Sequence, residues 1–273
     1  MNPETSPDSA DQQLAQALAA EAGDLLVSLR TSVPSGRELG DLGDQRANEL
    51  LLRRLAEERP DDAVLSEESA DDPARLQADR LWIIDPVDGT REYGLGDRPD
   101  WAVHVALWER DGDPTLARLT ASAVALPALG IVLGTGPEWT GPGSSYDGPR
   151  EQLLMPARED DRPRIVHSAS RPPAFARDVA DAVEGRLEPL GSAGAKAAAV
   201  VLGEADAYIH AGGQHQWDSA APAGVALAQG LTACRIDGSQ LEYNGSGTYL
   251  PDFVVCRPEL ADAILDAIAK HAG

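Results

Sequence analysis

Two aspartates that directly follow a short apolar run are well placed to bind cations. The segment Asp-Pro-Val-Asp-Gly-Thr, from Asp85 to Thr90, comes straight after Trp-Ile-Ile. Proline stops the ladder of a strand, and Gly89 permits a tight turn that exposes amide groups to an incoming anion. Hard Mg²⁺ ions bind few carboxylates and complete their shell with water and substrate phosphate. The segment therefore has the composition of a two-metal phosphatase site.

A simpler interpretation of the same segment is a surface turn, because Asp-Gly is a common turn dipeptide. The apolar run that ends at Asp85 favours the metal site, and so do further acids elsewhere in the chain. An EF-hand is excluded, since the alternating acidic rhythm and its distant Glu are missing. If a helix or turn begins at Gly89 and Thr90, its free N–H groups would hold a phosphate.

Helices and short strands surround this segment in the first half of the chain. Leucines at helical spacing predict a helix from about residue 14 to 29, and a second from about residue 45 to Pro60, with a polar loop between them. Strands are expected at 63–65 and 81–84, and then at 101–107, 122–126 and 130–134. The acids at 67 and 85 thus follow two predicted strands.

Strand and helix patterns alternate in the second half. Strands are predicted at 165–168, 207–210, 231–236 and 253–256, and helices at 174–183, 196–202, 218–229 and 258–271. Such alternation predicts a layered α/β architecture. Stretches rich in Gly, Pro, Ser and polar residues at 134–148 and 154–163 are candidate junctions. We expect an N-terminal α+β subdomain over residues 1–155 and a C-terminal α/β subdomain over residues 156–273.

Composition narrows the classes of function. The 273 residues include 45 Asp and Glu against 23 Lys and Arg, a net charge of −22. Such a field repels nucleic acid and anionic lipid, so neither is an expected partner. Cys234 and Cys256 have no metal-site spacing and are expected to be core residues. No basic start or long apolar run stands at the N-terminus, and we expect a cytoplasmic protein.

Three motifs in the same order resemble the inositol monophosphatase superfamily of Mg²⁺-dependent, Li⁺-sensitive phosphatases. They are Leu-Ser-Glu-Glu-Ser at 65–69, the Asp85 to Thr90 segment, and Trp-Asp-Ser-Ala-Ala at 217–221. The Arg-Glu-Tyr that follows Thr90 is similar to CysQ-type 3′-phosphoadenosine 5′-phosphate phosphatases. Stretches at 101–104, 191–196 and 210–214 most resemble actinobacterial CysQ proteins. The resemblance implies an αβαβα sandwich and, commonly, a homodimer.

The resemblance also implies roles for the acids. Glu67, Asp85 and the Val87 carbonyl would bind one Mg²⁺, while Asp85, Asp88 and Asp218 would bind a second, with Asp85 bridging. A third, weaker ion would lie near Glu67, and Li⁺ would inhibit. Cations are needed because phosphate esters and hydroxide repel each other. A place for Asp218 near a helix N-terminus would stabilise its ionised form.

The remaining predicted residues would activate water or bind substrate. Asp44 would pair with Thr90 to activate the attacking water, although an N-cap acid and a turn hydroxyl are simpler interpretations. Glu67 is also assigned a catalytic role. Predicted substrate contacts are Asp88, Gly89, Thr90, Ser192, Lys196 and His210. Nucleotidase relatives often have Arg at the position of His210, and a neutral His would hold a phosphate less firmly.

The leading hypothesis is a phosphoric monoester hydrolase, acting on a small phosphate ester. It would remove the 3′-phosphate of adenosine 3′,5′-bisphosphate, and of its sulfated relative, by metal-activated attack of water, clearing a by-product of sulfate assimilation. An inositol phosphate or fructose 1,6-bisphosphate phosphatase is the alternative within the same chemistry. A catalytically silent cation-binding protein is a more remote one.

Overall fold

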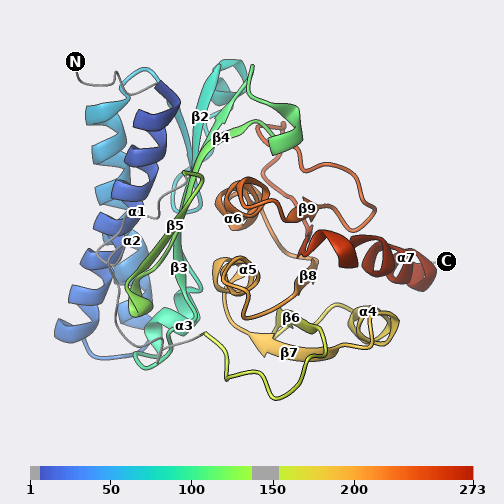
Figure 1. Cartoon of the computed structure of the whole chain (residues 1–273). Coiled ribbons are helices and arrows are strands. Elements are labelled where there is room, and N and C mark those ends of the chain that lie inside the picture. The colour runs from blue at the N-terminus through green and yellow to red at the C-terminus, as the bar shows by residue number, and fades with distance from the viewer. Residues whose placement is uncertain (1–6, 137–153, 273) are drawn as a thin grey trace, which may run out of the picture.

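The computed structural model describes residues 7–136 and 154–272. Within these residues the chain forms seven α-helices and two five-stranded sheets, stacked in alternating layers of helix and sheet (Figure 1). The first half contributes α1 (Pro7–Ser32), α2 (Arg37–Glu58), β1 (Ala63–Ser66), β2 (Arg80–Asp88), α3 (Thr90–Gly94), β3 (Ala102–Glu109), β4 (Leu119–Leu126) and β5 (Ile131–Gly134). The second half contributes β6 (Arg164–Ser168), α4 (Ala176–Ala182), β7 (Arg186–Leu190), α5 (Ala193–Val201), β8 (Ala207–Ala211), α6 (Gln216–Ala228), β9 (Thr232–Cys234), β10 (Asp252–Cys256) and α7 (Ala261–Ala272).

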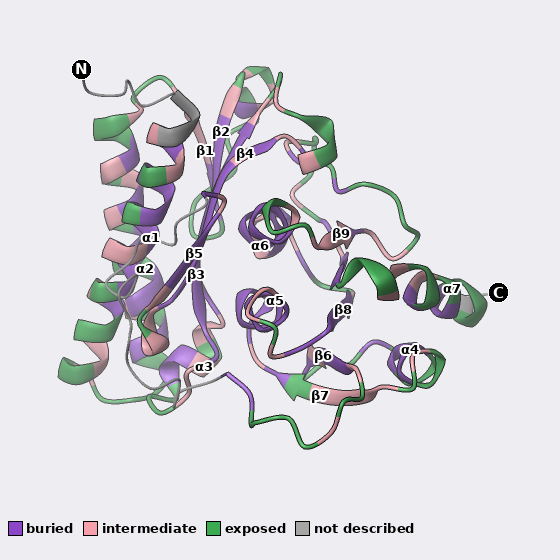
Figure 2. Ribbon diagram, viewed as in Figure 1, coloured by how far each residue is buried: buried purple, intermediate pink, exposed green. Residues whose placement is uncertain are grey.

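The first sheet has the strand order β1-β2-β3-β4-β5, with β1 parallel to β2 and the other neighbours antiparallel. Helices α1 and α2 cover one face, and α5 and α6 cover the other. Successive side chains of β2 point to opposite faces of the sheet. Trp82 and Ile84 pack in the core under α1 and α2, whereas Leu81 and Ile83 pack in the core under α5 and α6. Figure 2 shows this sheet buried on both sides. The alternation therefore aims Asp85 at α5 and α6.

The second sheet has the order β7-β6-β8-β10-β9, in which β6 is parallel to β7 and β8, and β10 is antiparallel to β8 and β9. Helices α5 and α6 lie between the two sheets, and α4 and α7 cover the outer face. Small residues let the middle helices approach closely. A Cβ on Gly224 of α6 would lie 2.1 Å from the Ser122 hydroxyl of β4, so a larger residue there would push the layers apart. The expected layered α/β sandwich is confirmed.

The polar loop predicted ahead of residue 45 is wrong, because α2 already begins at Arg37. Gly40 and Gly43 favoured a loop on propensity, but both lie inside the helix where α3 packs against it. A Cβ on Gly43 would come within 2.4 Å of the Tyr93 ring. The glycines are there for close packing rather than for a turn, and Asp44 consequently lies within a helix.

Strand β7 has no counterpart among the predicted elements. It pairs only with β6 and carries Pro189, which an edge strand tolerates because it needs no N–H on its open side. Residues 137–148 of one candidate junction lie outside the described residues. Among the described helices, none combines the length and the apolar character needed to cross a bilayer.

Candidate active site

An irregularity in β2 places two aspartates on one face of the first sheet. Strict alternation would send Asp85 and Asp88 to opposite faces. On the neighbouring strand β3, Asp85 pairs with His104 and Asp88 pairs with Ala102, so three steps on β2 match two on β3. The extra residue is a bulge at Pro86 and Val87. The sequence predicted that Pro86 would end the strand, and this prediction is wrong because pairing continues to Asp88. The bulge turns both carboxylates toward α5 and α6.

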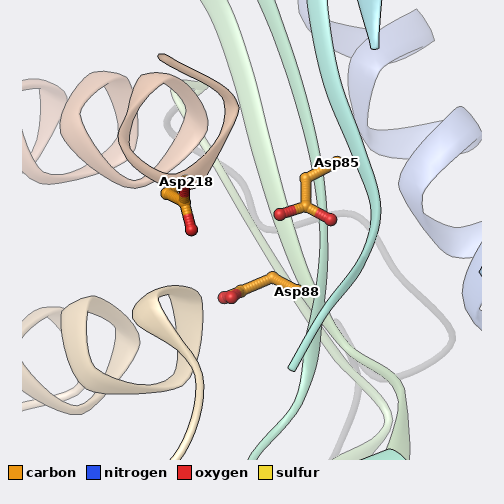
Figure 3. A group of neighbouring side chains, drawn as sticks. All are labelled: Asp85, Asp88 and Asp218. Atoms are coloured by element: carbon orange, nitrogen blue, oxygen red, sulfur yellow. The ribbon is translucent and has the colours of Figure 1, made fainter. Parts of the chain in front are cut away.

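Asp218 supplies a third carboxylate from the opposite side. It is the third residue of α6, and its Oδ2 accepts a hydrogen bond of 2.7 Å from the His215 backbone N–H, as in a capping box. Ligand oxygens of Asp85, Asp88 and Asp218 lie within 4.8 Å of one another. Figure 3 shows the two strand residues and the helix residue converging on one space.

The electrostatics of this cluster fit a cation. Burial, and then the charges of Glu67, Asp88 and Asp218, raise the pKa of Asp85 far above its ordinary value. Burial and the charge of Asp88 raise the pKa of Asp218 to about 6. The buried Oδ1 of Asp85 has no hydrogen-bond partner among the described residues. An unpartnered carboxylate oxygen among like charges is a suitable ligand for Mg²⁺ or a similar hard ion.

Asp88 is held in its ionised form. Burial alone would raise its pKa, but His104, the Gly194 amide and Lys196 together lower it below the ordinary value. The Nε2 of His104 lies 3.2 Å from Asp88 Oδ2, and the amides of Ala193 and Gly194 at the start of α5 donate to the same carboxylate. A helix N-terminus therefore stabilises this charge.

Glu67 lies beside the cluster rather than within it. It follows β1, whose parallel pairing with β2 sets Ser66 against Ile84 and so brings Glu67 next to Asp85. Desolvation of its carboxyl and the charge of Asp218 raise the pKa of Glu67 to about 7. The residue as a whole is exposed, so Glu67 lies on the solvent side of the acid cluster.

Thr90 links α3 to α2 at the edge of the cluster. Its hydroxyl oxygen lies 3.2 Å from Asp44 Oδ1 and 3.2 Å from the Val87 carbonyl oxygen, and its single proton serves one of them at a time. Burial and the charges of Glu68 and Glu67 raise the pKa of Asp44 to about 8. The predicted pairing of Asp44 with Thr90 is therefore present, made by a helix residue and not by a loop residue.

Gly89 makes the approach of α5 to this loop possible. It precedes α3 with a φ of 88°, in the left-handed region that favours glycine. A Cβ there would lie 2.8 Å from the Cβ of Ser192. The Ser192 hydroxyl accepts a hydrogen bond of 3.0 Å from the Ala195 N–H, so it caps α5.

Lys196 and His210 both lie near the site, but each already has an intramolecular role. Burial lowers the pKa of Lys196 to about 8, and its ammonium donates to the carbonyls of Gly191 and Ser192. Burial lowers the pKa of His210 to about 4, so its imidazole is neutral near pH 7, and its Nε2 lies 2.8 Å from the Gly212 carbonyl oxygen.

A cleft of about 370 Å³ joins these residues. Its lining includes Asp88 and Asp218 of the acid cluster and the loop of residues 168–171. Predicted residues on its wall are Asp88, Gly89, Ser192, Lys196, His210 and Asp218. Carboxylates of the acid cluster and several basic side chains therefore share the wall of one space.

Sequence reasoning missed two residues of this region as site residues. His104 stands in an apolar strand, and only its cross-strand pairing with Asp85 shows that it faces the acids. The signal that could have found it is alternation, since Ala102, His104 and Ala106 share a face. Arg171 follows β6 in a Ser-Arg-Pro stretch that has the appearance of an ordinary loop.

Comparisons with known proteins agree on one family. A profile of the inositol monophosphatase family matches residues 9–272. The chain is 50% identical over 254 residues to a Mycobacterium bovis protein named 3′-phosphoadenosine 5′-phosphate phosphatase, covering 91% of this chain and 90% of that protein. A Mycobacterium leprae protein of the same name is 49% identical, covering 95% and 94%.

Solved structures show the same fold at lower identity. CysQ from Bacteroides thetaiotaomicron superposes with a TM-score of 0.72 at 24% identity, covering 91% of this chain and 97% of that one. Inositol monophosphatase II from Staphylococcus aureus gives 0.72 at 19% identity, covering 95% and 96%. With the acids of β2 and α6 in place, the chain belongs to the inositol monophosphatase family of phosphatases, as its motifs predicted.

Proposed function

We propose that the protein is a Mg²⁺-dependent phosphatase that removes the 3′-phosphate of adenosine 3′,5′-bisphosphate to give AMP and phosphate. The observation that carries this proposal is that the acid cluster opens onto a cleft lined by basic side chains, in a chain half identical to mycobacterial 3′-phosphoadenosine 5′-phosphate phosphatases. Cations held by the acids would suit the phosphate to be cleaved, and the basic side chains of the same cleft suit a second anionic group.

The residues present would hold the cations in two overlapping sets. Asp85, Asp88 and Asp218 would share one ion, and Asp85, Glu67 and the Val87 carbonyl a second. Bound cations would neutralise the negative charge of the phosphate, lower the pKa of a water ligand and stabilise the departing oxygen. They would also relieve the repulsion that raises the carboxyl pKa values.

The chain itself would orient water and phosphate. With its proton donated to Asp44, the Thr90 hydroxyl has an oxygen free to accept a hydrogen bond from the attacking water. The first free amides of α3, behind Gly89, would hold the phosphate oxygens. The water oxygen bonds to phosphorus, the bond from phosphorus to the 3′ oxygen breaks, and that oxygen takes up a proton.

Phosphate release from three substrates tests the proposal. With Mg²⁺, we expect a higher kcat/KM on adenosine 3′,5′-bisphosphate than on inositol 1-phosphate or fructose 1,6-bisphosphate. Asp85→Asn should lower kcat by at least about a hundredfold, since removing one well-placed charge-stabilising group costs that much. Asp61→Asn, on an exposed acid, is the matched control. Preference for inositol phosphate, or an active Asp85→Asn variant, would refute the proposal.

A further inference from the structure

The cleft contains a guanidinium that has no partner among the described residues. Three arginines line the cleft, and Arg98 is held by Asp100 at 2.7 Å. Among the described residues, no carboxylate pairs with the side chain of Arg91 or Arg171, and neither donates a hydrogen bond from its guanidinium. Arg91 lies on α3, which follows β2 of the first sheet, whereas Arg171 follows β6 of the second sheet.

A glycine in the turn between β8 and α6 provides the space for Arg171. A Cβ on Gly213 would lie 2.3 Å from the Arg171 Nη1, so the end of the arginine side chain would have to move away from its present position. The preceding Gly212 also has a positive φ, yet a Cβ there would meet nothing within 4 Å. Only the second glycine is therefore needed by the guanidinium, which lies directly against its backbone.

Two other basic groups of the cleft are less available to a ligand. The Lys196 ammonium donates to two backbone carbonyls, and His210 is neutral near pH 7. Burial lowers the pKa of His210 first, and the positive charges of Lys196 and Arg171 lower it further, so both cations lie close to this imidazole. Of these three side chains, Arg171 is the one that donates no hydrogen bond to any described residue.

We propose that Arg171, seated against Gly213, binds the phosphate that is not cleaved and so makes the enzyme selective for nucleoside bisphosphates over monophosphates. The inference deepens the proposed function and rests on it. A planar guanidinium matches two oxygens of a phosphate, and such charge-assisted pairs are strong hydrogen bonds. The scissile phosphate would lie at the acid cluster, and the second phosphate would lie at Arg171, which lines the same cleft.

The test measures the selectivity of the enzyme for the bisphosphate over the monophosphate, and not its activity on one substrate. The ratio of kcat/KM for adenosine 3′,5′-bisphosphate to that for 3′-AMP should fall about ten- to a hundredfold in Arg171→Ala, as expected for loss of a charged hydrogen bond. Turnover of 3′-AMP itself should change little. Arg171→Lys should recover part of the ratio. Arg177→Ala, on an exposed arginine of α4 outside the cleft, removes the same charge and should leave the ratio unchanged.

The two adjacent glycines give a second, matched test. Both variants, Gly212→Ala and Gly213→Ala, strain a backbone of positive φ, but only the second displaces Arg171. Gly213→Ala should lower the selectivity ratio, and Gly212→Ala should not. In an Arg171→Ala background, Gly213→Ala should have no further effect on the ratio. Equal effects of the two glycine variants would contradict the seating role.

The outcomes separate this inference from the proposed function. A wild-type enzyme that hydrolyses the bisphosphate while Arg171→Ala keeps its full selectivity would overturn the inference alone. A wild-type enzyme that hydrolyses neither nucleotide would overturn the proposed function. In that case calorimetric measurement of AMP binding tests the inference. Arg171→Ala should weaken the affinity for AMP about tenfold or more and leave the affinity for adenosine unchanged. Equal AMP affinity in both proteins would refute the role of Arg171.

Discussion

Replacing Asp85 by Asn should stabilise the metal-free protein while lowering its kcat by at least about a hundredfold. Asp85 is buried beside two further carboxylates, and an amide of the same shape removes its charge without leaving a cavity. Two unit charges 4.8 Å apart repel by about 3.5 kcal/mol at an effective dielectric constant of about 20. If Asp85 instead takes up a proton, each pH unit above its usual 3.8 costs about 1.4 kcal/mol.

Charge repulsion and proton uptake each lower the free energy of unfolding of the metal-free wild type. The Asp85→Asn variant has neither cost. Allowing for relaxation and solvent in the cleft, about 2 kcal/mol should be recovered near pH 7, which raises Tm by about 4–8 °C in a chain of this size. The gain should shrink as the pH falls and vanish well below the ordinary value of 3.8, because the carboxyl is then protonated in the unfolded chain too. With Mg²⁺ the order reverses, since a ligand at a hundred times its Kd adds about 2.7 kcal/mol to the wild type.

Thermal unfolding followed by circular dichroism, in EDTA and in excess Mg²⁺, measures both effects. Asp61→Asn removes one exposed negative charge and should leave Tm unchanged in both conditions. The reasoning is refuted if Asp85→Asn is less stable than the wild type in EDTA near pH 7. It is equally refuted if Mg²⁺ stabilises the variant as much as the wild type.

Three further predictions follow from the same geometry. The metal-free protein should lose stability as pH rises from about 4 to about 8: the pKa values of Asp218, Glu67 and Asp44 are raised to about 6, 7 and 8, so the folded state binds more protons than the unfolded state across this range. Asp44→Asn should lower kcat by about 10²–10⁴ in steady-state assays without loss of folding, as for removal of a general base. His104→Ala should weaken Mg²⁺ binding about 10–100-fold in calorimetry, because it removes a group that positions Asp88.

Each of these predictions has a contradicting result. A metal-free Tm that rises between about pH 5 and 8 would mean that the acids are not crowded in solution. For Asp44, the control is Asp41→Asn, one turn earlier on α2 and exposed; equal losses in both variants would exclude a specific role in activating water. Unchanged Mg²⁺ affinity in His104→Ala would mean that the α5 amides alone orient Asp88.

Much of the site follows from local signals in the chain. An apolar run ending in Asp85, the proline and glycine after it, and an acid near the start of a predicted helix at residue 218 are readable because strand and helix patterns are local. The boundaries of most predicted elements also agree with the structure to within a few residues. Local propensity misled where a distant element intervened: the glycines of α2 predict a loop but serve its packing against Tyr93.

The sequence by itself determined the family, the layered α/β class and the acids that would bind cations, because these depend on residue types and spacings along one chain. Only the tertiary structure decided which face the acids share, through the bulge between Asp85 and Asp88, and which groups meet them from other elements. His104 reaches the acids across a strand pair, and Arg171 reaches the cleft over Gly213, 42 positions later in the chain. Contacts of that kind depend on how layers pack, and no periodicity within a segment encodes them.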